Sequence, residues 1–169
     1  RVEHFSLCLP RHIEAAARLH LALPMQPVFT YLWDNPDLPG GDSYEYVIGR
    51  ERVDRNDPFP AIIEAGGVIS GGSDSAVTPI DPLLGIHAAA NAPNPLRRVS
   101  LDDAIKMFTI NGAWVGHEET EKGSIEVGKL ADFTVIDRDP YQEQEFIKDF
   151  KVEMTIVEGK TVYTRPDAR

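Results

Sequence analysis

Short apolar runs alternate with helical patterns along the first half of the chain. The stretches from Val2 to Cys8 and from Leu23 to Tyr31 are typical of strands. A helix is expected between them, from Arg11 to Leu21, since the preceding residue is a proline and apolar residues recur on one face. The residues expected on that face are Ile13, Ala16, Ala17 and His20.

A polar segment separates these elements from the next strand. Pro24 and Pro27 fall inside the second run, which we expect to be a strand with an irregular ladder. A Gly-, Pro- and Asp-rich stretch, residues 33–57, follows, and loops of this length are usually functional or mobile. A short helix from Pro58 to Ala65 then leads into a buried, glycine-bounded strand at Val68. This β-α-β order predicts an α/β fold.

The pattern changes from helical to β in the second half. Helices are expected from Leu83 to Ala90 and behind a capping-box-like start at Ser100. From residue 123 onward β patterning dominates, and Glu158-Gly159 is the turn of an expected hairpin. We therefore predict a boundary between an α/β part, residues 1–120, and a β part, residues 121–169.

Composition excludes some classes of function. Of the 169 residues, 42% are hydrophobic and 26% are charged, and no apolar run approaches the about 20 residues of a membrane helix. The net charge of −10 argues against nucleic-acid binding, and Arg97-Arg98, the one basic doublet, is expected to be solvated. The single Cys8 is expected to be a buried thiol, and its isolation fits a cytoplasmic location.

An acid follows the glycine-bounded strand, in the sequence Gly72-Ser73-Asp74-Ser75. The glycines let the backbone leave the strand sharply. Barrel enzymes keep catalytic carboxylates at such strand ends, which favours a catalytic role for Asp74. These residues alone are equally consistent with a polar turn or a helix cap.

Two further segments join this motif to a known family. Arg1-Val2-Glu3-His4 followed by Gln26-Pro27 resembles the sixth and seventh strand ends of metal-dependent amidohydrolases. The segment from Gly123 to Asp137, which contains Gly-Lys-Leu-Ala-Asp, is similar to their return into a small β-sandwich. The chain resembles amidohydrolase family 3, which includes exoenzyme regulatory proteins and deformylase-like or aminoacylase-like hydrolases, from Arg1 to about Tyr163.

The resemblance implies the last three strands of a TIM-type (β/α)8 barrel with their helices, followed by part of the β-sandwich. A complete barrel needs about 250 residues. We therefore expect this chain to be the C-terminal piece of a longer enzyme, with the first five strands upstream.

The resemblance also implies the chemistry, which is hydrolysis of a non-peptide C–N bond in a small amide by metal-activated water. Asp74 would be the catalytic acid and base and a metal ligand, and His4 a second ligand. By the same resemblance the cofactor would be a divalent metal, with zinc as the expected ion, as one or two ions. Gln26 and Trp33 belong to an alternating set along and just beyond the second expected strand, and Arg52 falls where the family carries an arginine, so all three are candidate substrate contacts. Ordinary strand packing for the first two and a surface loop position for Arg52 are equally consistent with the sequence.

Several parts of such a site are missing from the sequence. The five histidines are far apart, so the paired histidines of the family's first strand are absent. The lysine that often bridges two metals in the family is absent too, because the first lysine, Lys106, comes after the acid motif. Since zinc prefers four ligands, we expect the chain alone to be inactive.

The alternative is a non-catalytic regulatory or oligomerisation module derived from such an enzyme. Three barrel strands without their neighbours have unpaired edges. We therefore expect a homo-oligomer or a strand-paired dimer.

Overall fold

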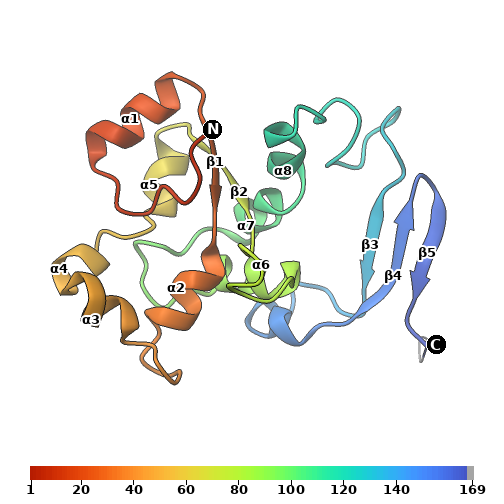
Figure 1. Cartoon of the computed structure of the whole chain (residues 1–169). Helices are drawn as coiled ribbons and strands as arrows, with labels where there is room; N and C mark the ends of the chain where they lie inside the picture. Colours follow the sequence, from red (N-terminus) through yellow and green to blue (C-terminus); the bar gives the residue numbers. More distant parts are fainter. Residues whose placement is uncertain (167–169) are drawn as a thin grey trace.

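Two parallel strands form the centre of the first part of the chain, and a three-stranded sheet lies to one side of it (Figure 1). The computed structural model describes residues 1–166. The elements of the first part are α1 (Pro10–Arg18), β1 (Ala22–Met25), α2 (Pro27–Trp33), α3 (Ser43–Ile48), α4 (Arg50–Val53), α5 (Phe59–Glu64), β2 (Val68–Gly71), α6 (Pro82–Ala90), α7 (Leu101–Met107) and α8 (Ile110–Val115).

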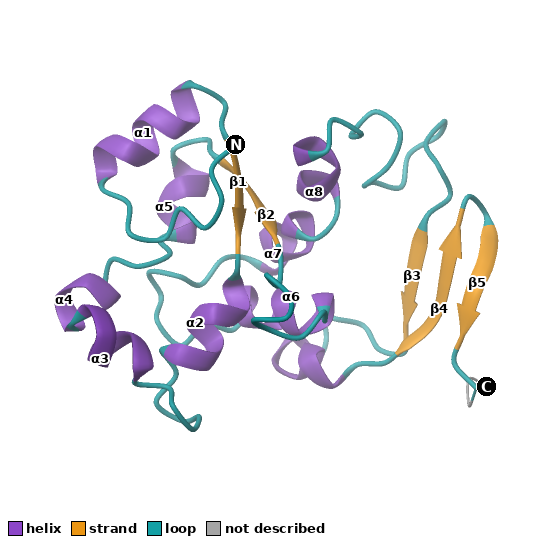
Figure 2. Ribbon diagram, viewed as in Figure 1, coloured by secondary structure: helices purple, strands orange, loops and turns teal. Residues whose placement is uncertain are grey.

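The strands β1 and β2 pair in parallel, with a register that runs from Ala22 opposite Val68 to Met25 opposite Gly71. Helices α2, α3, α4 and α5 lie between them along the chain, and α5, α7 and α8 pack against β2. Figure 2 shows helices on both sides of the strand pair. The predicted β-α-β order is therefore present. Apolar strands that helices cover on both faces pair most readily in parallel.

The first expected strand, Val2–Cys8, does not form as predicted. The backbone N–H of Val2 donates to Ala22 O and that of His4 donates to Pro24 O, both at 2.9 Å, so the chain begins beside β1. It then turns away, because His4 and the next residue have φ values of 66° and 47°. These angles lie outside the extended region.

The second expected strand, Leu23–Tyr31, ends at Met25. Pro27 is the first residue of helix α2, where its fixed φ and missing N–H suit a helix start. Gln26 is the N-cap residue between strand and helix. The prediction was wrong here because a helix-starting proline was interpreted as an irregularity within a ladder.

Other helices differ less from expectation. The polar stretch contains α3 and α4, which are separated by Gly49 with a φ of 79°. Helix α1 buries Ile13 and Ala16 as predicted, but it ends at Arg18, so His20 lies beyond the helix and is exposed. Helix α8 was not predicted.

The helices that follow β2 begin at side-chain caps. Asp81 Oδ1 accepts hydrogen bonds from Leu83 N at 3.0 Å and Leu84 N at 3.1 Å at the start of α6. Ser100 Oγ accepts from Asp103 N at 3.1 Å at the start of α7, as the capping-box pattern predicts. The helix cap near the acid motif is therefore Asp81.

The second part is an antiparallel sheet in the order β3 (Phe133–Ile136), β4 (Val152–Val157) and β5 (Lys160–Thr164). The turn of the predicted hairpin joins β4 to β5. A 3-10 helix, η1 (Gln144–Asp149), packs on α6, where Asn91 Nδ2 donates to Gln144 O at 3.0 Å. Ile147 of η1 is 1% exposed within the core, so η1 anchors the sheet to the α/β part. The boundary between residues 120 and 121 stays a prediction.

Arg97 is buried, and the expectation of a solvated basic doublet is wrong for this residue, whose exposed fraction is 1%. Its guanidinium forms an ion pair with Asp34, its Nε donates to Asn56 O at 2.9 Å, and its Nη2 donates to Val53 O. Burial lowers the pKa of Arg97 to about 10. These partners satisfy a charge that would otherwise be costly to bury.

Asp57 continues this polar network into the N-terminal segment and is 2% exposed. Its Oδ2 accepts from Asn56 Nδ2 at 2.7 Å, and its backbone N–H donates to Ser6 O at 3.1 Å. Burial raises the pKa of Asp57 to about 7, opposed by a hydrogen bond from Ser6 and by the charge of His4. The network therefore connects Arg97 with the segment that carries His4.

Replacing Arg97 with alanine should destabilise the fold strongly. The change leaves two buried carbonyls without their donor, and loss of one partner of a buried ion pair typically costs about 3–5 kcal/mol. The free energy of unfolding from urea titrations measures the effect. The control is Arg55→Ala, which removes an exposed ion pair with Glu51 and should cost less than about 1 kcal/mol. Equal effects of the two changes would contradict the assigned role.

Replacing Asp57 with asparagine should remove a pH dependence of stability. Between pH 3.8 and about 7 the folded protein holds a proton on Asp57 that the unfolded chain releases. Wild-type stability therefore falls as pH rises through this window, by roughly 4 kcal/mol for a shift of about three units.

The measurement is the difference in unfolding free energy between wild type and Asp57→Asn at several pH values. The stability of Asp57→Asn relative to wild type should increase as pH rises. The exposed Asp54→Asn serves as control, and a difference that stays constant across the window would refute the assignment.

Candidate functional site

The structure brings together the two residues predicted as metal ligands. His4 Nε2 lies 4.0 Å from Asp74 Oδ2, and the two side chains are 49% and 45% exposed. Both residues have positive φ, 66° for His4 and 49° for Asp74. Non-glycine residues in this region are uncommon and concentrate at functional sites.

Asp74 lies just beyond the carboxyl end of β2. Gly72 N donates to Met25 O at 2.9 Å, which continues the pairing with β1 by one residue. The chain then turns, and Val77 N donates to Asp74 O at 2.8 Å. Since His4 leaves the other side of β1 at the same end, the two side chains meet at one edge of the parallel strands.

Gln26 is also part of this group. It is 8% exposed, and its Oε1 lies 2.8 Å from His4 Nδ1. The amide oxygen thus already has a partner within the protein. The predicted contact of Gln26 with substrate stays a prediction.

A row of aromatic rings extends from His4 along α2. Phe29 stacks on His4 with ring centroids 6.0 Å apart, and Trp33 lies 4.7 Å from Phe29. Phe29 and Trp33 share a helical face because they are four residues apart, whereas Tyr31 packs edge-on against His87. Trp33 is thus connected to the site through Phe29.

Arg52 lies elsewhere. Its Nη1 donates to Ile48 O at 3.2 Å, and it lines a separate hollow of about 260 Å³ together with Cys8 and His12. Within residues 1–166, no hydrogen bond or ion pair joins Arg52 to His4 or Asp74. The structure therefore does not bring Arg52 to the candidate site.

Cys8 is a buried thiol, as predicted. Its exposed fraction is 8%, and burial raises the pKa of Cys8 to about 11. A thiol with a raised pKa is a poor nucleophile at neutral pH.

His4 and Asp74 lie within reach of one metal ion only at the outer limit of ligand separation. Zinc binds nitrogen and oxygen ligands at about 2 Å, so two ligands of one ion lie at most roughly 4 Å apart. The separation of 4.0 Å falls at that limit. Within the described residues no group of three or more His, Cys, Asp or Glu side chains could hold a metal. A complete coordination shell therefore requires ligands in addition to these two.

Sequence reasoning missed Asp57 in the surroundings of this site. The charge of His4 affects its pKa, and burial together with the charge of Asp57 raises the pKa of Tyr44. The only local signal is the polar pair Asn56-Asp57 directly before Pro58. Such a pair is typical of an exposed loop, so its burial follows from tertiary packing alone.

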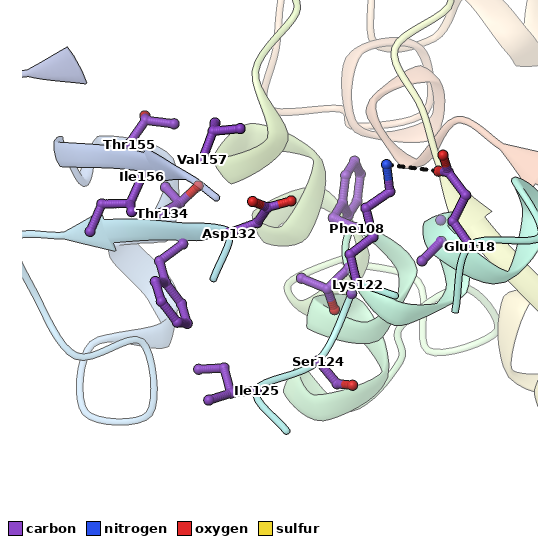
Figure 3. A pocket seen from close by; sticks show the side chains of 15 residues that line it. Phe108, Glu118, Lys122, Ser124, Ile125, Asp132, Thr134, Thr155, Ile156 and Val157 are labelled. Atoms are coloured by element: carbon purple, nitrogen blue, oxygen red, sulfur yellow. Dashed lines mark ion pairs between the residues drawn. The ribbon is translucent and has the colours of Figure 1, made fainter. Parts of the chain in front are cut away.

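A larger cleft of about 580 Å³ lies away from these residues, between α8 and the β-sheet. Figure 3 shows that Glu118 and Lys122 line one side, opposite Thr134 and Thr155. Lys122 Nζ is paired with Glu118 Oε2 at 2.8 Å, and neither His4 nor Asp74 lines the cleft. The two predicted metal ligands and this cleft therefore do not coincide.

In residues 1–166 we find no helix with both the length and the apolar character needed to cross a membrane.

The chain is similar to curated protein sequences over nearly its whole length. It is 30% identical to the protein named "Putative amidohydrolase YtcJ" of Bacillus subtilis, covering 90% of this chain and 30% of YtcJ. It is 28% identical to the N-substituted formamide deformylase of Arthrobacter pascens, covering 98% of this chain and 31% of the deformylase. The chain thus spans less than a third of the length of these curated relatives.

The fold is similar to that of an uncharacterised metal-dependent hydrolase from Pyrococcus furiosus, with a TM-score of 0.68 and 28% identity. The match covers 83% of this chain and 28% of that protein. It confirms the predicted α/β class, a partial barrel followed by part of a smaller sheet. A sequence profile of the amidohydrolase family matches residues 1–163. The chain therefore belongs to the amidohydrolase family.

Proposed function

We propose that this chain is the C-terminal portion of a longer metal-dependent hydrolase that cleaves C–N bonds of small, non-peptide amides. The observation that carries the proposal is the pairing of His4 Nε2 with Asp74 Oδ2 at 4.0 Å, at the carboxyl end of two parallel strands. That end is where barrel enzymes assemble catalytic residues. Membership of the amidohydrolase family supports the reaction class.

The cofactor in this proposal is a divalent metal, with zinc as the preferred ion. Neutral imidazole nitrogen and carboxylate oxygen are both ligands that zinc accepts. A bound ion lowers the pKa of a coordinated water toward neutrality and polarises the carbonyl that the water attacks.

Asp74 moves the proton in the reaction. Its carboxylate takes a proton from the attacking water as the new C–O bond forms, and gives it to the nitrogen as the C–N bond breaks. The side chain is half exposed, so water and substrate reach it in the described chain. His4 would hold the ion through Nε2 and would not need to change its protonation state.

Small amides are the favoured substrate class. One relative is named an N-substituted formamide deformylase, which supports an amide whose nitrogen carries a substituent. The row formed by Phe29 and Trp33 lies next to His4 and would contact an apolar substituent. Gln26 and Trp33 remain proposed substrate contacts. Arg52 is a weaker candidate for a substrate contact, because it lies away from His4 and Asp74.

The chain alone should have no useful turnover, because two ligands rarely hold zinc. Within the described residues no larger ligand group is present. The remaining ligands would come from the part of the longer protein that precedes His4, in keeping with the small fraction of its relatives that the chain covers.

Replacing Asp74 with asparagine in the longer protein should lower amide hydrolysis by at least about 10²–10⁴-fold, the usual contribution of general acid–base catalysis. Turnover of N-acyl amino acids and N-substituted formamides, together with metal content, measures this. The isolated chain should be inactive in the same assay.

The matched control is Asp37→Asn, a change at an exposed aspartate near the start of the polar stretch, which should keep wild-type turnover. Full activity of the Asp74 variant would show that the acid motif is only a turn. The non-catalytic module would then be the better account.

The isolated chain should also self-associate. Within residues 1–166, the parallel sheet consists of β1 and β2, and Val2 and His4 are hydrogen-bonded to the outer edge of β1. The outer edges of β2 and of this N-terminal segment are the edges that could pair with another copy. Light scattering at micromolar concentration should therefore give a dimer or a larger assembly. A monomer under these conditions would contradict strand pairing between copies.

A further inference from the structure

Gln26 is held rigidly between the two strands and the site. Its carbonyl accepts from Phe29 N at 3.0 Å in the first turn of α2, and its side chain is 8% exposed. Pro27 restricts the backbone directly after it. The position of the Gln26 amide is therefore set by the junction of β1 and α2.

The contact with His4 determines where the imidazole carries its proton. Gln26 Oε1 lies 2.8 Å from His4 Nδ1, and an amide oxygen can only accept a hydrogen bond. Nδ1 must therefore be the protonated nitrogen of the neutral ring, which leaves the lone pair on Nε2. Nε2 is the nitrogen that faces Asp74 at 4.0 Å.

We propose that Gln26 is a positioning residue that holds neutral His4 in the Nδ1–H tautomer and directs the Nε2 lone pair toward Asp74. Histidines that bind metals usually donate their second ring N–H to such a partner, which fixes both tautomer and ring orientation. The consequence for metal binding rests on the proposed function, but the tautomer itself does not.

The chain contains an internal reference for this inference. His12 Nδ1 accepts a hydrogen bond from the backbone N–H of Leu9 at 3.2 Å. His12 must therefore carry its proton on Nε2, the opposite tautomer to His4. The two histidines can be compared in one sample.

The test is nitrogen NMR of the histidine-labelled chain at about pH 8, above the ordinary histidine pKa of about 6.5. Long-range proton–nitrogen correlations show which ring nitrogen is protonated, and loss of one signal set in His4→Asn assigns His4. We expect the proton on Nδ1 of His4 and on Nε2 of His12. A proton on Nε2 of His4 in the wild type would overturn the inference.

Two variants of Gln26 separate positioning from packing. Gln26→Leu has a similar volume but no acceptor, so the His4 proton should move to Nε2. Gln26→Glu keeps an acceptor at the same distance and should retain the Nδ1–H tautomer. An unchanged tautomer in Gln26→Leu would also overturn the inference, whereas the His12 signals should not change in either variant.

Zinc titration of the longer protein then distinguishes this inference from the proposed function. Gln26→Leu should weaken zinc affinity by about 10–100-fold, the usual effect of losing such a partner, and Gln26→Glu should restore it. If wild type binds no zinc while the tautomers are as expected, the proposed function fails and the positioning role stands. A tautomer change without any loss of zinc affinity would overturn the link to the metal.

Discussion

The buried guanidinium of Arg97 is the interaction on which the arrangement around the site depends. Arg97 binds Asp34 at the end of α2 and the carbonyls of Val53 and Asn56 after α4. Asn56 in turn holds Asp57, whose backbone bonds the segment that follows His4. A buried charge tolerates little displacement, because each lost partner leaves an unsatisfied group. The polar stretch is therefore anchored although it contains only short helices.

The candidate site lies beside this anchored polar stretch and presents two half-exposed side chains, those of His4 and Asp74. His4 lies beside β1 and Asp74 follows β2 at the same end of the strands, and both residues have positive φ. The buried Gln26 contacts the His4 imidazole at Nδ1 through its Oε1. In the proposed chemistry, the side chains of His4 and Asp74 remain accessible to metal and substrate, whereas Gln26, which contacts His4, is buried.

The sequence was informative where local pattern and order along the chain carried the information. The glycine-bounded strand and the helix from Ser100 were expected on such grounds. The meeting of His4 with Asp74 was expected from the resemblance to the amidohydrolase family. The helix at Pro27 was missed because a proline suits both an irregular edge strand and a first helical turn. The burial of Arg97 and Asp57 could not be predicted, because a charged residue in a Pro- or Asn-rich segment is usually solvated and only tertiary packing provides its partners. Arg52 was a candidate through the family resemblance alone, and in the structure it bonds Ile48 O within the polar stretch, away from the site.

The most direct test of the account is the position of the metal. A crystal of the longer protein grown with zinc, with an anomalous difference map recorded at the zinc absorption edge, locates the ion without reference to activity. The account predicts a peak bound to both His4 Nε2 and Asp74, each at about 2.0–2.2 Å. A zinc peak that neither residue contacts would contradict the central claim that these two side chains form part of the catalytic centre.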